Sequence, residues 1–162
     1  MKTRTLIIVA IAFVLIVLLS NRISLYFGLQ DTAGLEEGMT FTQYTELFPE
    51  DKRIDFCNYS ICVNDKGFPV LIRCVDDKIV KIEVIDLSKA SDKPERFEEL
   101  TPGMTLSQVV QKVGAPDGYS KVDDMTLVYN SRNEWIYQIQ FTSEDNVLYV
   151  KSVTSESIEQ AQ

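Results

Sequence analysis

Apolar and polar residues alternate with a period of two along six stretches of the chain, which is typical of half-buried β-strands. The stretches form two sets of three: 57–63, 68–74 and 79–85, then 125–130, 135–142 and 147–153. A short run with helical spacing of its apolar residues precedes each set, over Phe41–Phe48 and over Leu106–Val113. The pattern therefore predicts the same unit twice, a helix followed by three antiparallel strands.

The stretch before each predicted helix is also repeated. Residues 35–43 and 100–108 share leucine, glycine, methionine, threonine and glutamine at identical spacing. Thr-x-x-Gln is a capping box, in which Thr40 or Thr105 accepts a hydrogen bond from the third helical amide and the glutamine accepts one from the threonine amide. Gly38 and Gly103 stand where a tight turn often needs positive φ. We interpret the repeat as a helix-starting device.

The predicted turn at residues 64–67 suggests a register for the first two strands. Pairing Val63 with Phe68 puts Cys57 opposite Cys74 and all apolar residues on one face. We therefore predict a disulfide between Cys57 and Cys74. The pairs Cys57–Cys62 and Cys62–Cys74 remain alternatives, as does a sheet that buries the cysteines as thiols.

An apolar run over Leu6–Leu19 follows Lys2 and Arg4. As a helix this run covers about 21 Å, and extension to Phe27 would bring it to the ~30 Å hydrocarbon core. The pattern predicts an uncleaved signal anchor in the inner (cytoplasmic) membrane, single-pass, with the C-terminal domain periplasmic or extracellular. A cleaved signal peptide is the alternative, although no small residue stands three positions before a cut near Ser20 or Ser24.

These patterns predict an α+β fold. An N-terminal transmembrane helix is followed by two repeats of a short helix packed on an antiparallel three- to four-stranded sheet. The predicted parts are a cytoplasmic tip and signal-anchor helix over 1–28, a linker over 29–34, a first repeat over 35–86, a connector over 87–99, a second repeat over 100–155 and a polar tail over 156–162.

Composition narrows the function classes. The chain has 162 residues, 16 basic and 24 acidic, for a net charge of −8. Such a balance argues against a nucleic-acid partner, because phosphate contacts need a basic footprint. The chain has no histidine, which removes the commonest general base and metal ligand. We expect no catalytic site, no metal and no cofactor, and we interpret the acidic pairs Asp76-Asp77 and Asp123-Asp124 as solvated turns.

The second repeat carries a family resemblance. Gly103-Met104-Thr105, then Val109, then Gly114-x-Pro116 and three strands resembles the SmpA/OmlA (BamE-like) domain of bacterial envelope proteins, over residues 100–153 and more faintly over 35–85. The first repeat keeps Gly38-Met39-Thr40 but has Leu47-Phe48-Pro49 in place of Gly-x-Pro. The tandem arrangement resembles the β-lactamase inhibitor protein fold. The resemblance implies a non-enzymatic protein, either an envelope assembly factor or an enzyme inhibitor.

One stripe of aromatic residues is the candidate binding surface. Trp135, Tyr137 and Phe141 share a face of their strand, and Tyr129 and Tyr149 on neighbouring strands would widen it. The stripe is either core beneath the second helix or an exposed platform for a protein partner, depending on which face the helix covers.

From these features we expect a membrane-anchored extracytoplasmic protein-binding module of the bacterial envelope, acting in envelope or outer-membrane protein assembly. The alternative is an inhibitor or immunity-type protein that binds and blocks a secreted or periplasmic hydrolase. The expected partners are an unidentified envelope protein and, through the N-terminal helix, the inner membrane.

Overall fold

The computed structural model describes residues 2–120, 125–131 and 134–157. A long helix, α1 (Lys2–Gln30), leads into a first unit made of α2 (Phe41–Leu47), a 3₁₀ turn η1 (Glu50–Lys52), β1 (Arg53–Phe56), β2 (Tyr59–Val63), β3 (Pro69–Val75) and β4 (Lys78–Val84). A short helix, α3 (Pro94–Glu98), precedes the second unit of α4 (Leu106–Val113), β5 (Gly118–Tyr119), β6 (Thr126–Ser131), β7 (Trp135–Glu144) and β8 (Val147–Ser157). The described strands form two antiparallel sheets, β1-β2-β3-β4 and β5-β6-β7-β8. The predicted α+β repeat is confirmed.

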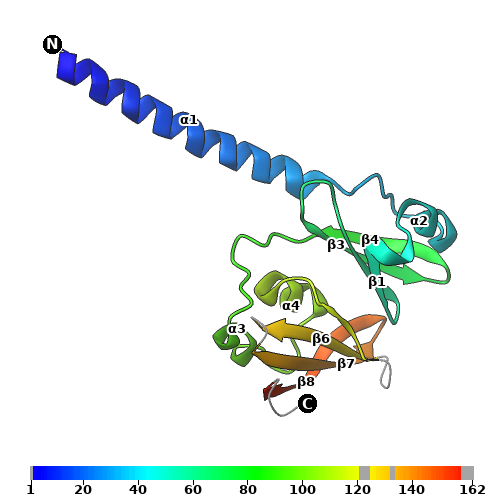
Figure 1. Cartoon of the computed structure of the whole chain (residues 1–162). Coiled ribbons are helices and arrows are strands. Elements are labelled where there is room, and N and C mark those ends of the chain that lie inside the picture. The colour runs from blue at the N-terminus through cyan, green and yellow to red at the C-terminus, as the bar shows by residue number, and fades with distance from the viewer. Residues whose placement is uncertain (1, 121–124, 132–133, 158–162) are drawn as a thin grey trace.

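The two units stack in four layers: α2, the first sheet, α4 and the second sheet (Figure 1). Tyr44 of α2 packs with Cys62 and Ile72 on one face of the first sheet. On the opposite face, Ile61 and Leu71 join α4 and the second sheet in one continuous core. The helix of the second unit is therefore covered by a sheet on each side.

The repeated stretch caps both helices as predicted. The Thr40 hydroxyl accepts a hydrogen bond from the Gln43 amide, and the Gln43 side chain accepts one from the Thr40 amide. Thr105 and Gln108 make the same two bonds at the start of α4. A helix start leaves four amides without intrahelical partners, and the capping box supplies acceptors for two of them. Both bonds lie within four consecutive residues, so a four-residue motif is enough to encode the cap.

The same stretch has a second role, which is tertiary. The Gly38 amide donates to the Ile79 carbonyl at 2.7 Å, and the Ile79 amide donates to the Met39 carbonyl at 2.8 Å. In the second unit, Gly103 and Met104 make the equivalent bonds with Val150, at 2.9 and 2.7 Å. The two glycines have φ of 91° and 88°, a region that residues with a Cβ rarely adopt. Each copy therefore starts a helix and ties it to the last strand of its own sheet.

Replacing the capping threonine of α4 tests the local role. We expect Thr105→Ala to lower the free energy of unfolding by about 1 kcal/mol, because the Gln108 amide loses its acceptor. Thr105→Ser keeps an acceptor oxygen and should cost much less. Chemical denaturation of the full chain measures both. Equal losses in the two variants would show that the hydroxyl does not cap the helix.

The predicted register of the first sheet is wrong by one residue. Val63 pairs with Pro69 rather than Phe68, so Ile61 lies opposite Leu71 and Cys62 opposite Val70. The connection between the paired residues is one residue longer than predicted, 64–68 rather than 64–67, and the Asn64 amide donates to the Phe68 carbonyl across it at 2.9 Å. The Asn64 side chain also accepts hydrogen bonds from the Lys66 and Phe68 amides. A slip of one residue exchanges the two faces of a strand.

Several elements lie in stretches that the sequence pattern left as connections. β1 begins at Arg53, α3 lies within the predicted connector over 87–99, and β5 follows α4. Asp76 and Asp77 both have positive φ and join β3 to β4 in a two-residue turn, as Asp145 and Asn146 do between β7 and β8. This conformation fits the twist of a tight hairpin. Asp123 and Asp124, and residues 158–162 of the predicted tail, lie outside the described residues.

α1 leads away from the two sheets as a single helix (Figure 1). Among the described residues, no helix is both long enough and apolar enough to cross a membrane. This finding contradicts the predicted transmembrane anchor over 1–28 and the predicted single-pass location in the inner membrane. The uninterrupted apolar run over 6–19 covers only about 21 Å as a helix, and its extension passes through Asn21 and Arg22.

The C-terminal end of α1 is held by the first unit. The buried Asn64 side chain, in the β2–β3 turn, donates to the carbonyl of Gly28 at 3.0 Å and to that of Asp31 at 2.9 Å. Gly28 lies in the last turn of α1, where carbonyls lack intrahelical partners, and Asp31 directly follows the helix. Two of the residues in the predicted linker over 29–34 belong to α1 itself, Leu29 and Gln30.

Candidate functional site

The candidate aromatic surface lies mostly in the core. Tyr129, Tyr137 and Phe141 are only 2%, 5% and 2% exposed, and they face α4 in the continuous core. Phe97 of α3 stacks on Tyr137 with ring centroids 4.1 Å apart and meets Tyr129 edge-on at 5.6 Å. The helix α3 in the predicted connector therefore covers part of the face that α4 does not reach. These three side chains cannot form an exposed platform.

The other two members of the stripe are more accessible. Trp135, at the start of β7, is 38% exposed. Tyr149 is half-buried and forms a β-bridge with Thr105. The Tyr129 hydroxyl is buried and has no hydrogen-bond partner among the described residues. Burial, followed by the negative charge of Asp117, raises the pKa of Tyr129 well above its usual value, so this hydroxyl stays protonated.

The cysteines are separated by the observed register. Cys57 lies in the β1–β2 turn with φ of 54°, and its Sγ is 3.1 Å from Sδ of Met125 in the second unit. Cys62 and Cys74 are free thiols, so none of the three disulfide pairings considered above is formed. Burial raises the pKa of Cys62 to about 12, although a hydrogen bond with Tyr44 partly opposes this shift. A buried thiol with such a pKa is unreactive in the folded chain.

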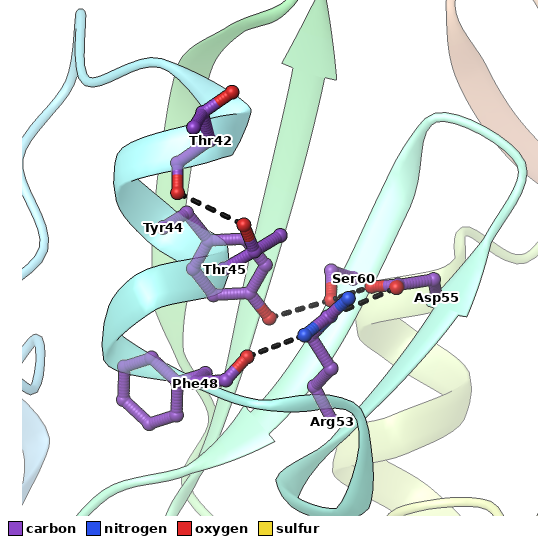
Figure 2. A network of polar contacts seen from close by, with 7 residues as sticks. All are labelled: Thr42, Tyr44, Thr45, Phe48, Arg53, Asp55 and Ser60. Carbon is purple, nitrogen blue, oxygen red and sulfur yellow. Dashed lines mark hydrogen bonds and ion pairs between the residues drawn. The ribbon is translucent and has the colours of Figure 1, made fainter.

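A polar network crosses the first core from α2 to β1 (Figure 2). Ser60 is fully buried, and its hydroxyl donates to Asp55 Oδ1 at 2.6 Å. The Tyr44 hydroxyl lies 2.6 Å from Ser60 Oγ. The Ser60 hydroxyl has a single proton, which it uses in the hydrogen bond to Asp55. The Tyr44 hydroxyl is therefore the donor of the second bond. The chain of bonds therefore runs from Tyr44 through Ser60 to Asp55.

Arg53 closes the network on the other side. Its Nε donates to Asp55 Oδ2 at 2.8 Å, and its Nη1 donates to the Phe48 carbonyl at the end of α2 at 2.5 Å. The guanidinium also lies 5.9 Å from the ring centroids of Phe41 and Tyr44, within the range of a cation–π interaction. Both ends of α2 are thus connected to β1 by one arginine.

This network is built to hold α2 on the sheet. A serine nucleophile needs a base that receives its proton and an open approach for a substrate. Ser60 is closed to solvent, and the chain offers no histidine. Burial raises the pKa of Tyr44 above its usual value, which keeps its proton in the bond to Ser60. We therefore assign the network a structural role.

A groove of about 520 Å³ lies where the two units meet, beyond the C-terminal end of α4. Phe48, Ile54 and Val63 line the side formed by the first unit, and Ala115 and Pro116 line the side formed by the second. Its polar lining includes Asp51, Lys52 and Asp117. Val63 is 51% exposed although it is an apolar residue in a strand. The groove is therefore an accessible and partly apolar surface between the two units.

An outer strand edge without a paired strand among the described residues lies beside this groove, and its strand, β1, also contacts β5 of the second unit. β1 is the terminal strand of its sheet, and within the described residues it is paired with β2 alone. An edge strand presents backbone N–H and C=O groups that can pair with an additional strand. The groove therefore combines an apolar surface with a backbone edge able to form hydrogen bonds.

Sequence reasoning missed both the network and the groove. Arg53 follows Glu50, Asp51 and Lys52 in a charged stretch, which gives no sign that its side chain is only 7% exposed in the structure. Ser60 offered a signal, since it is a polar residue between the apolar residues Tyr59 and Ile61. The groove offered none, because its two sides come from stretches more than 50 residues apart in the chain.

Neither a family model nor a curated protein matches this chain. The resemblance to the SmpA/OmlA domain remains a prediction that rests on the motif residues alone.

Proposed function

We propose that this chain is a non-enzymatic protein-binding module that holds an extended segment of a partner polypeptide in the groove beside β1. The single observation that carries the proposal is the free edge of β1 along an apolar groove. An extended polypeptide matches both features, because its backbone can pair with the strand edge while alternate side chains enter the groove. The envelope role that the family resemblance implies remains part of this proposal.

The charge of the chain suggests what the partner segment carries. A net charge of −8 attracts basic partners and raises their association rate, and salt weakens this effect. We therefore expect a partner segment with apolar residues at alternate positions and basic residues among them. The inhibitor alternative predicts an exposed aromatic patch, whereas three of the five residues of the candidate aromatic surface are buried.

Photo-crosslinking from the groove tests the proposal. A photoreactive amino acid at Val63, in the full chain within its native cells, should give adducts with one partner protein. The matched control is Val80, which is 39% exposed on β4, the opposite edge strand of the same sheet. Adducts of equal yield from both positions, or none from Val63, would contradict the proposal.

Hydrogen exchange with the purified partner then tests the binding mode. Strand addition should slow exchange of β1 amides in the complex, because they gain acceptors. Unchanged exchange of the β1 amides, with slower exchange only at amides elsewhere in the chain, would contradict strand addition. The Val63 adduct peptide identifies which part of the partner to compare.

A further inference from the structure

A second cavity lies at the opposite end of α4 from the groove. Its volume is about 90 Å³, and it lies between the first sheet, the start of α4 and the start of β8. Charged side chains of β3 and β4, Arg73, Lys81 and Glu83, line one side, and Thr105 and Ser107 line another. Because this cavity is separate from the groove, the inference drawn from it does not rest on the proposed function.

Arg73 is the unusual member of the lining. Its Nε is buried, and it donates no hydrogen bond to any residue that the structure describes. Nor does its guanidinium form an ion pair within the described chain. Arg73 as a whole is half-buried, but a buried donor atom left without an acceptor is destabilising. The planar guanidinium is also the group best suited to bind an oxyanion through two parallel bonds.

The neighbouring charges indicate the charge of the missing partner. Lys81 Nζ lies 3.0 Å from Glu83 Oε2, and the Ser107 hydroxyl donates to Glu83 Oε1 at 2.5 Å. Burial opposes the charge of Glu83, but these two partners outweigh it and hold its pKa below its usual range. Two cations and one anion leave a net charge of +1. A monoanion balances this charge, whereas a dianion would be repelled by Glu83.

The start of α4 adds to this preference. Thr105, Leu106 and Ser107 are the cap and the first two residues of the eight-residue helix, and all three line the cavity. The first amides of a helix carry a partial positive charge. The capping box uses the amides of Thr105 and Gln108, which leaves the amides between them without a partner from that motif.

We propose that this cavity is a binding site for a single carboxylate group, held by the guanidinium of Arg73 with Lys81 beside it. The volume suits a carboxylate and excludes a bulky ligand. The carboxylate is supplied either by the free C-terminus of a polypeptide or by an aspartate or glutamate side chain. Both sources offer the same two oxygens to the arginine.

A titration of the full chain with sodium acetate tests the site. Nuclear magnetic resonance of the Arg73 Nε–H group should show a saturable shift with acetate and none with sodium chloride at equal ionic strength. Lys81→Gln should weaken acetate binding by about tenfold or more, and Arg73→Gln should abolish it. The matched control is Arg96→Gln, since Arg96 forms an exposed ion pair with Glu99 away from the cavity.

Three results would overturn the site. They are a shift that does not saturate, an equal shift with chloride, and an equal weakening in the Arg96→Gln control. If Arg73→Gln fails to fold, the resonance of the native Arg73 and the Lys81→Gln variant still decide the question. None of these measurements depends on the groove or on Val63, so this site and the proposed function can fail separately.

Short peptides identify the source of the carboxylate. One peptide has a free C-terminus, the second is its C-terminal amide, and the third is the amide with one aspartate. Tighter binding of the first peptide assigns the site to a C-terminus, and tighter binding of the third assigns it to an acidic side chain. Equal binding of all three would overturn the carboxylate site.

Discussion

Replacing Phe56 by alanine should lower the free energy of unfolding of the whole chain by about 3–5 kcal/mol. Phe56 belongs to the first unit and is 2% exposed. Its ring meets Phe141 of the second unit edge-on, with centroids 5.7 Å apart. Truncation would leave a cavity in the core that both units share. The loss should therefore appear in both units rather than in the first alone.

Two probes follow the two units separately. Trp135 is the single tryptophan, and its fluorescence reports on the second unit. Cys62 is buried in the first unit, and alkylation of its thiol, located by mass spectrometry, reports on opening of that unit. We expect both probes to give one coincident transition in the native chain and in Phe56→Ala, as two-state unfolding requires. Separate midpoints, with the Trp135 transition unmoved by Phe56→Ala, would show that the units fold independently.

A matched control and a double-mutant cycle sharpen this result. Tyr119 is 50% exposed, and Tyr119→Ala should change the stability by about 0.5 kcal/mol or less. The pair Phe56→Ala and Phe141→Ala should show a coupling of about 0.5–1.5 kcal/mol, the range for aromatic pairs in contact. A coupling near zero would show that the two rings do not connect the units.

Replacing Ser60 by alanine should destabilise the chain by about 1–3 kcal/mol. The variant leaves the buried Tyr44 hydroxyl without its oxygen acceptor and removes one donor to Asp55. The thiol of Cys62 would be the remaining partner of Tyr44, and sulfur is a weak acceptor. Chemical denaturation measures the loss. Ser143→Ala, at an exposed serine of β7, is the matched control and should be close to neutral.

Removing the second hydroxyl should restore part of this loss. Tyr44→Phe in the native chain breaks a buried hydrogen bond and should destabilise. In the Ser60→Ala background the same change removes a hydroxyl that has lost its acceptor, so it should be neutral or stabilising. Additive losses in the double variant would contradict the direct bond between the two hydroxyls.

Local features of the fold could be predicted from the sequence because few residues determine them. The capping boxes of Thr40 and Thr105 each need only four consecutive residues. The order of helix and strands in each unit followed from apolar periodicity in the same way. The register of β2 and β3 failed because it depends on one residue of turn length, which Asn64 fixes through side-chain bonds to two amides.

The candidate site was harder to predict, because its groups come together across the chain. Arg73 was assigned to no role, since its significance lies in a cavity completed by α4 and β8. Lys81 and Glu83 are the polar residues of the alternating pattern over 79–85, and in the structure they line that cavity. The aromatic stripe was correctly placed on one face of β7, but its burial depends on α3 and α4 together.

The sequence by itself determined that two similar units follow one another and where their helices begin, because these features depend on neighbouring residues. The tertiary structure alone decided how the units stack. Placing α4 between the sheets buries both faces of β2 and β3, so four consecutive residues of each strand are buried. In strands buried on both faces, alternation along the sequence does not show which face each helix covers. For the same reason, the stretch Gly103-Met104-Thr105 could be recognised as a helix start, while its pairing with β8 required the folded sheet.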